Sequence, residues 1–311
     1  LVWSLNAAFQ SMLWTPVMRL LALYFREDHL RERANETIAL TLIVGHFIAW
    51  AISGFVSAAA DWRFSFIVPA AVAACAIAAM CKTCMTLNPL SVRSASGTRS
   101  RDPIVHVLAA TGFFLVILTC ILYGFIRDSV ITWAPTLLAR ISGGHALSSA
   151  AFTLILPVIN IAGVLLGFCL RRRGARPHGV VALMMLAAYL HQQSIKPKCS
   201  LQAIAASAAL LGSGGMLLTA VLLGTICAAM YGANTMLTGL IPLEYDRVGR
   251  TSLTAGMIDS FIYLGSALAG VFGGSIFDAM GAHTLYGSWI IAGGISAILM
   301  LLAMRMSNSY W

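Results

Sequence analysis

Residues 104–126 read IVHVLAATGFFLVILTCILYGFI and contain no aspartate, glutamate, lysine or arginine. A helix of about 20 apolar residues is long enough to cross the roughly 30 Å hydrocarbon core of a lipid bilayer. The stretch is continuously apolar rather than alternating, which favours a helix over a strand of a membrane barrel. It therefore predicts a transmembrane helix.

The rest of the chain repeats this pattern. The 311 residues are 59% hydrophobic and only 10% charged, whereas about 25% of the residues of a soluble domain are charged. Apolar runs occur at 1–25, 38–60, 64–81, 104–138, 147–170, 252–276 and 284–304, and the region 179–242 can hold two more. We predict an all-α, multi-pass membrane protein with about nine transmembrane helices. Within 178–215 the next helix can lie at about 179–194 or around 201–215.

The net charge of +9 follows the loops rather than one patch. If successive loops alternate sides, one side holds most of the basic residues, namely Arg26, Arg31, Arg33, Lys82, Arg93, Arg99, Arg101, Arg171, Arg172, Arg173, Arg176, Arg247, Arg250 and Arg305. Arg63, Arg140, Lys196 and Lys198 fall on the other. The positive-inside rule makes the first side cytoplasmic. We expect a monomer in the plasma (inner) membrane, surrounded by lipid and without a nucleic-acid partner.

Two segments resemble each other and suggest an internal repeat. Residues 54–80 and 273–299 each end one apolar run, turn briefly at an aspartate and enter a second run. Two parallel six-helix repeats are the design of the major facilitator superfamily. We expect helices four to twelve of twelve, with Leu1 inside helix four and three helices preceding it. Residues 1–81 would end the first half, 82–103 form a central cytoplasmic loop, and 104–311 form the second half.

Three motifs carry a closer resemblance. The pattern Asn6-x-x-Phe9-Gln10-x-Met12-x-Trp14-x-Pro16-x-x-Arg19 resembles helix four of the organophosphate:phosphate antiporters, which transport glycerol 3-phosphate and hexose phosphates. Arg127-x5-Trp133-x-Pro135 resembles helix seven of that family. Ala255-Gly256, Tyr263-Leu264-Gly265 and Asp278 resemble its helix eleven. The likeness spans nearly all of the chain except 178–215.

Arg127 is the main candidate for substrate binding. It stands beside Asp128 in YGFIRDSVITWAPTLLAR, residues 123–140, where apolar character resumes after the charges. If the helix ended at Ile126, Arg127 would only mark the membrane interface. A helix continuing toward Pro135 would place the guanidinium inside the membrane, where arginine faces a polar cavity or snorkels. Its fork of donors suits a phosphate. The resemblance implies that Arg127 is one of two arginines that clamp the substrate phosphate. Asp128 departs from the family pattern and can neutralise Arg127 or face elsewhere.

Four other polar residues interrupt apolar runs. His46 is either a packed core residue or, as the resemblance implies, a substrate contact, although Ile43 replaces the asparagine of the family motif. Tyr231 and Tyr263 match family tyrosines that line the pocket, and either can instead be a packing residue. Asn234 lies three residues after Tyr231, so both can share one helix face.

Asp259 is the one acidic residue clearly inside an apolar run. It can pair with a cation, bind a substrate hydroxyl or carry a proton. It can also lie near a cytoplasmic helix start, where the helix dipole favours a negative charge. The arginine triplet 171–173 is interpreted first as an orientation signal.

These features predict a secondary transporter that works by alternating access and is not an enzyme. Its expected reaction is exchange of a phosphorylated small metabolite, or a similar organic anion, for inorganic phosphate. We expect no cofactor or metal, because the chain has no GxxxxGK[ST] loop and its one CxxC pair, Cys81 and Cys84, has no second pair nearby. One alternative is a membrane sensor of sugar phosphates with a transporter fold. Another is a proton-coupled facilitator or exporter in which Asp259 and His46 matter more than Arg127.

Overall fold

The computed structural model describes residues 2–25, 27–59, 63–86, 104–141, 155–195 and 213–310, and every element in these ranges is helical. The elements are α1 (Val2–Tyr24), α2 (Asp28–Ala59), α3 (Phe64–Thr86), α4 (Ile104–Ala110), α5 (Phe113–Ile141), α7 (Ile155–Arg172), α8 (Pro177–Ile195), α10 (Ser213–Asn234), the π-helix η1 (Thr235–Leu240), α11 (Ile241–Glu244), the 3₁₀ helix η2 (Tyr245–Val248) and α12 (Thr251–Tyr310). The prediction of an all-α fold is confirmed.

The membrane character is confirmed as well. Within the described ranges, five segments are long and apolar enough to cross a bilayer: Phe66–Thr83, Phe113–Trp133, Val221–Val248, Thr251–Ser275 and Thr284–Tyr310. The helices α1, α2, α7 and α8 overlap further runs that the sequence predicts to span. Of the two placements left open within 178–215, the structure contains the helix at 177–195, and residues 196–212 lie outside the described chain.

The predicted span 104–138 is wrong in one respect, because it is not one continuous helix. Gly112 adopts a positive φ of 71°, a backbone conformation that L side chains rarely adopt, and separates α4 from α5. From Phe113 onward α5 continues past Arg127 to Ile141. The arginine is therefore inside a long helix and not at its end.

Although α12 is helical throughout, it contains two membrane-crossing arms. A Cβ at Gly265 would meet the backbone of Ile121, and one at Gly273 would meet Trp133, so the first arm runs in the same direction as α5. In the second arm Trp289 Nε1 donates to Ser129 Oγ over 2.9 Å. A Cβ at Gly112 would lie 3.1 Å from the Cβ of Met306, so this arm runs in the opposite direction. The chain thus reverses between Ser275 and Thr284, where the sequence predicts a turn.

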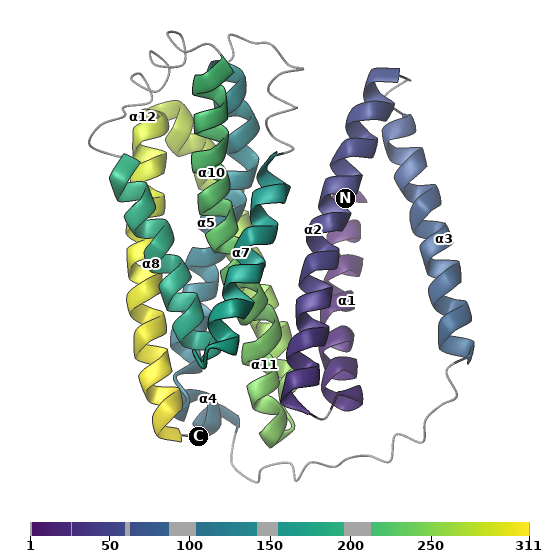
Figure 1. Cartoon of the computed structure of the whole chain (residues 1–311), viewed down its shortest axis with the longest axis vertical. Helices are drawn as coiled ribbons and strands as arrows, with labels where there is room; N and C mark the ends of the chain where they lie inside the picture. Colours follow the sequence, from purple (N-terminus) through teal and green to yellow (C-terminus); the bar gives the residue numbers. More distant parts are fainter. Residues whose placement is uncertain are drawn as a thin grey trace.

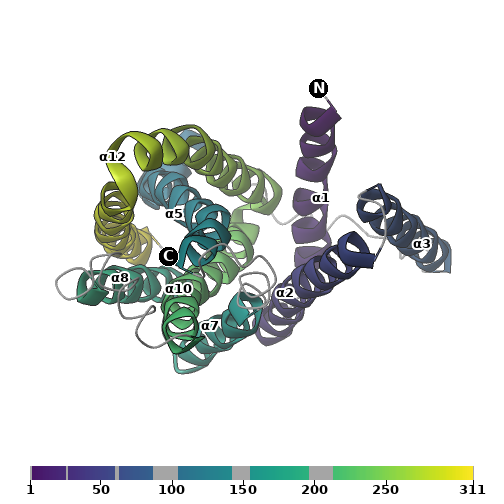
Figure 2. The same ribbon diagram turned by 90° about the horizontal axis from the view of Figure 1, so that it is seen from above.

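Helices α5, α7, α8, α10 and α12 form the main bundle (Figure 2), together with the short elements η1, α11 and η2 that join α10 to α12. Small residues let their backbones approach closely: a Cβ on Gly163 of α7 would lie 1.9 Å from the carbonyl oxygen of Ala228 on α10. Likewise, a Cβ on Gly124 of α5 would lie 2.0 Å from the carbonyl oxygen of Ile262 on α12. Close packing across glycine is a usual way for helices to associate in lipid, where the hydrophobic effect does not drive them together.

The three N-terminal helices stand beside this bundle (Figure 1). There α2 lies next to α7, while α3 stands on the far side of α2 and no other described helix covers its span, which is 0% buried. The helix α2 begins at Asp28, ten residues before the predicted span, so the expected loop 26–36 is mostly helix. The reason is that its first turns carry Arg31, Glu32 and Asn35, which contact the main bundle. The division into two halves at 82–103 stays a prediction, and residues 87–103 lie outside the described chain.

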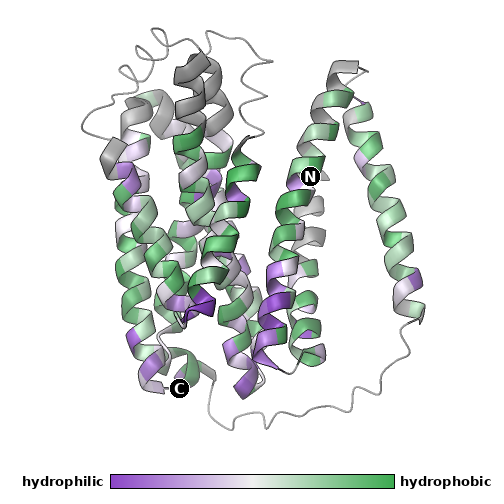
Figure 3. Cartoon of the chain, viewed as in Figure 1, coloured by the Kyte–Doolittle hydropathy of each residue, from purple (hydrophilic) through white to green (hydrophobic). Residues whose placement is uncertain are grey.

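The hydrophilic residues gather mainly at one end of the molecule, the end that holds α11 and the C-terminus (Figure 3). Most of the surface along the helices is apolar, with exposed leucine, isoleucine and phenylalanine side chains such as Phe66, Leu166 and Ile298. Such a surface suits the hydrocarbon core of a bilayer. Arginines of α2, of the last turn of α7 and of η2 meet at the hydrophilic end, as expected if these segments share one side of the membrane. That this side is the cytoplasm stays a prediction.

Candidate functional site

A cavity of about 570 Å³ lies between the N-terminal helices and the main bundle. Its walls come from α1, α2, α5, α7, α10, η1 and α12. The residues that line it are Leu13, Trp14, Ala39, Leu42, His46, Arg127, Asp128, Ile131, Val164, Tyr231, Asn234, Thr235, Thr238, Asp259 and Tyr263. All six candidate residues of the sequence analysis are among them. The structure therefore brings together residues that are up to 217 positions apart, from His46 to Tyr263.

Arg127 is the central cation of this cavity. Its side chain is 17% exposed, and its Nε donates to Asp128 Oδ1 over 2.6 Å while Nη2 donates to Oδ2 over 3.1 Å. The guanidinium carbon also lies 5.4 Å from the ring centroid of Tyr123, a cation–π distance. Arg127 thus faces the cavity, and of the two possibilities for Asp128 the neutralising one is observed.

Tyr123 supports Arg127 and was missed in the sequence. It is fully buried, and its hydroxyl donates to Asn234 Oδ1 over 3.1 Å, which fixes the orientation of that amide at the cavity wall. The sequence does contain a signal, because Tyr123 lies four residues before Arg127 and so on the same helix face. An aromatic residue in an apolar run nevertheless looks the same whether it packs or positions a neighbour.

Asp259 and Tyr263 occupy the α12 wall, four residues apart on one face. Within the described chain Asp259 makes no ion pair and no hydrogen bond. Three lining residues carry a formal charge, Arg127, Asp128 and Asp259. With His46 neutral, the described lining has a net charge of −1. Tyr231 lies on α10, three residues before Asn234, and is partly buried.

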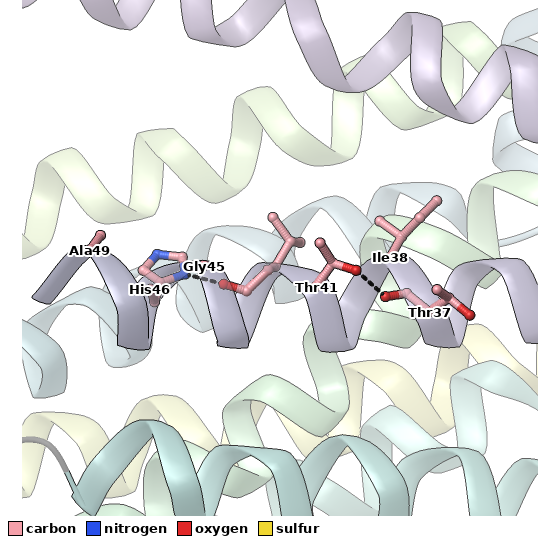
Figure 4. Close-up of a pocket in the computed structure, with 7 residues that line it drawn as sticks. Thr37, Ile38, Thr41, Gly45, His46 and Ala49 are labelled. Carbon is pink, nitrogen blue, oxygen red and sulfur yellow. Dashed lines mark hydrogen bonds between the residues drawn. The ribbon is translucent and has the colours of Figure 1, made fainter. Parts of the chain in front are cut away.

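His46 lies on an exposed face of α2 rather than in a packed core. Its Nδ1 is 2.7 Å from the carbonyl oxygen of Leu42, so it donates there and leaves Nε2 for another partner. Thr37, Thr41, Gly45 and Ala49 follow the same face and line a groove of about 470 Å³ (Figure 4). His46 and Leu42 border both this groove and the cavity, so the two spaces adjoin.

The sequence comparisons identify the family. A sequence model of the Major Facilitator Superfamily matches residues 1–230. The chain belongs to the Major Facilitator Superfamily. A search of curated proteins finds no match. Members of this superfamily are transporters rather than enzymes, so the protein is a secondary transporter and the cavity is its natural candidate for a solute site. The match does not extend to a subfamily.

In this facilitator, ion pairs join the N-terminal helices to the main bundle at the arginine-rich end. Arg31 of α2 donates to Asp246 of η2 over 2.6 Å, to the carbonyl oxygen of Ala22 in the last turn of α1, and to that of Phe25, which follows α1. Arg171 pairs with Glu32 over 2.8 Å, and Arg172 pairs with Glu36. Two arginines of the triplet, Arg171 and Arg172, therefore have structural partners in addition to the predicted orientation role. Partly exposed pairs are worth about 1 kcal/mol or less each, so they suit a contact that must open.

Further contacts lie between these ion pairs and the cavity. Trp14 Nε1 donates to the carbonyl oxygen of Thr238 over 3.1 Å, and Asn35 Nδ2 donates to that of Thr235 over 3.0 Å. Trp14 belongs to the motif quoted for helix four but was not expected in the cavity, and both threonines were missed. Threonine in an apolar helix commonly returns its hydroxyl to the backbone, as Thr238 Oγ1 does toward Asn234, so its type gives little signal.

Proposed function

We propose that this facilitator exchanges a phosphorylated small metabolite, such as a glycerol or sugar phosphate, or a similar organic anion, for inorganic phosphate across the plasma membrane. The observation that supports this is the state of Arg127. Its guanidinium is largely buried in a cavity and presents two N–H groups side by side to the two oxygens of Asp128. An edge with two parallel N–H donors is how arginine binds phosphate in a bidentate manner.

Asp128 acts in this proposal as an internal occupant of the phosphate position. A carboxylate and a phosphate offer Arg127 similar pairs of oxygens, so the substrate takes the place of Asp128 rather than adding to it. A phosphate dianion carries twice the charge of the carboxylate and is attracted to Arg127 more strongly, whereas a monoanion competes with Asp128 at equal charge. Tyr231, Tyr263 and Asn234 supply further polar groups at the wall. A volume of about 570 Å³ lies within the 300–1,000 Å³ range typical of small-molecule sites.

The charge balance restricts how an anion can bind. The described lining carries a net charge of −1, so a dianion would bring the site to −3. Like charges in a site of low dielectric repel strongly, and a carboxylate among them binds a proton more readily. We therefore expect a monoanionic form of the substrate, or uptake of a proton at Asp259 or His46, to accompany binding.

A second candidate, proton-coupled transport of another small solute, is favoured by Asp259. This carboxylate borders the cavity without an ion pair in the described chain, as a proton carrier requires. In that case Arg127 and Asp128 form a structural pair, and the proton gradient rather than phosphate drives the solute. A sugar-phosphate sensor would share the binding site but show no flux.

Exchange in liposomes distinguishes these possibilities. Purified protein is reconstituted in vesicles loaded with phosphate, and uptake of labelled phosphate is followed with and without glycerol 3-phosphate outside. We expect saturable uptake that requires internal phosphate and that glycerol 3-phosphate inhibits. An imposed pH gradient without internal phosphate should drive none. Uptake driven by the pH gradient and lost in Asp259→Asn would overturn the exchange proposal in favour of the second candidate. Binding without any flux would identify a sensor.

A further inference from the structure

The helix that begins as α10 changes geometry where it borders the cavity. Residues Thr235–Leu240 form a π-helix, and the backbone N–H of Ile241 donates to the carbonyl oxygen of Met236, five residues back. The sequence gives a local reason, because Pro242 has no N–H for the carbonyl of Thr238 and its ring crowds that oxygen. Such π-turns are rare, and they frequently occur at functional sites.

Two side chains from the N-terminal helices end on this π-helix. The indole of Trp14 donates to the carbonyl of Thr238, the group that Pro242 leaves without its α-helical partner. The amide of Asn35 donates to the carbonyl of Thr235 and is only 2% exposed. A Cβ at Gly239 would lie 2.1 Å from Asn35 Oδ1, so the amide fits only because residue 239 is glycine.

The π-helix lies between the cavity and the ion pairs at the arginine-rich end. Thr235 and Thr238 line the cavity, as does Trp14. Asn35 follows Arg31 and Glu32 by one helical turn on the same face of α2, and both of those residues make ion pairs with the main bundle. A change in the π-helix therefore reaches both the solute site and the contact that closes this end.

We propose that η1 is a two-state coupling element, π-helical while the arginine-rich end is closed and α-helical when that end opens. Trp14 and Asn35 stabilise the π form by satisfying its carbonyls. When α1 and α2 withdraw, these hydrogen bonds are lost. The i→i+4 ladder then supplies the carbonyl of Thr235 with the N–H of Gly239, while the carbonyl of Thr238, which Pro242 still leaves without a backbone donor, faces the opened cavity and its water. Closing one π-turn shifts the register by one residue, which is a rotation of about 100° and a rise of about 1.5 Å. The shift moves Thr235 and Thr238 relative to Arg127, whichever solute the cavity takes.

The test measures the opening of the arginine-rich end directly. Nitroxide labels are placed at Arg33 and Arg173, both exposed and adjacent to the paired residues Glu32 and Arg172, in a protein whose native cysteines are replaced. Pulsed electron–electron double resonance then measures the distances between the two labels. The ratio of molecules with a long distance to those with a short one is the ratio of open to closed protein. Trp14→Phe keeps an aromatic ring but removes the donor, and we expect the ratio of open to closed protein to rise about fivefold, the value of one neutral hydrogen bond. Asn35→Ala should raise it by at least as much.

Pro242→Ala distinguishes a coupling element from a simple latch. It changes neither Trp14 nor Asn35 but restores an N–H to the helix, so it should also enrich the open form about fivefold. Gly270→Ala is the matched control, because a Cβ there meets nothing within 4 Å, and it should leave the ratio unchanged. Glu32→Gln removes the ion pair with Arg171 and should raise the ratio. It serves as the positive control for the assay.

Each result bears on the proposal. If Trp14→Phe and Asn35→Ala leave the ratio within twofold of the unaltered protein while Glu32→Gln raises it, the π-helix does not hold this end closed. If both raise it but Pro242→Ala does not, the contact is a latch without a change of helical geometry, and the proposal is again overturned. Thermal unfolding in detergent, measured on every variant, separates a shift of the ratio from a loss of fold.

Discussion

At the scale of single residues, the fork of Arg127 is the feature on which the phosphate proposal depends. Arg127→Lys keeps the positive charge but loses the planar pair of donors that Asp128 now accepts. We expect affinity for glycerol 3-phosphate to fall roughly ten- to a hundredfold, the scale of one hydrogen bond to a charged group. Calorimetry in detergent measures it. The control is Arg305→Lys, which is exposed on α12 and should bind as the unaltered protein does. Equal affinity in both variants would show that Arg127 does not bind the phosphate.

Replacing Asp128 should change the affinity in the opposite direction. If the carboxylate occupies the phosphate position, Asp128→Asn removes a competitor and one negative charge from the cavity. The affinity for phosphate should then rise, by up to about fivefold if the partial neutralisation of Arg127 resembles a modest ion pair. Titration of the variant with inorganic phosphate checks the direction. A decrease would mean that Asp128 positions Arg127 for its task rather than taking the place of the substrate.

At the scale of helices, glycines set the distance between neighbours. A Cβ at Gly163 would lie 1.9 Å from a backbone oxygen of α10, and at that distance the backbone itself must move. Gly163→Ala should therefore separate α7 from α10 and cost about 1–3 kcal/mol or more. The expected result is a lower midpoint of thermal unfolding in detergent, or no folded protein. Gly270→Ala, with open space around it, should unfold at the same temperature as the unaltered protein.

His178, in the first turn of α8, makes the stability of the fold depend on pH. Burial, with the nearby Arg176 as a second cause, lowers the pKa of His178 to about 4, although Glu244 lies 3.7 Å from its Nδ1. The unfolded chain takes up this proton near pH 6.5 and the folded chain only near pH 4. Stability is therefore full above pH 6.5 and falls as the pH drops toward 4, by on the order of 3 kcal/mol. In His178→Gln the midpoint of thermal unfolding should change less between these two pH values. An unchanged slope would assign the acid sensitivity to other groups.

The sequence predicted the helices and the conspicuous polar residues of the cavity better than it predicted side-chain contacts and local changes of helical geometry. Charged and polar residues inside apolar runs are conspicuous, which is why Arg127, His46 and Asp259 were found, and the structure places all of them at one cavity. The contacts of Tyr123 and Thr235 were not found, because such residues satisfy apolar periodicity equally well as packing. The π-helix has no periodicity of its own and depends on Pro242 together with partners from α1 and α2. The break at Gly112 was missed because glycine is frequent in membrane helices and only its φ distinguishes a turn.

At the scale of the whole molecule, one end collects the arginines and the contacts that hold α1 and α2 to the main bundle. In Figure 1 α2 lies close to α7 and α11 at that end and leans away from α7 toward the other. The cavity therefore lies beyond a closed end. The positive-inside rule predicts that this end faces the cytoplasm, and on that prediction the conformation is the one closed to the cytoplasm.

This orientation gives the last prediction, which labelling in intact cells tests. In a protein whose native cysteines are replaced, a single cysteine is placed at Arg173, exposed between α7 and α8, or at Arg63, exposed before α3. The positive-inside rule places position 173 in the cytoplasm and position 63 outside. A membrane-impermeant maleimide should therefore label Arg63→Cys in intact cells, and Arg173→Cys only after lysis. The opposite pattern would reverse the orientation and make the closed end the outer one. The substrate would then meet the cavity from the cytoplasm, with η1 on the outer side.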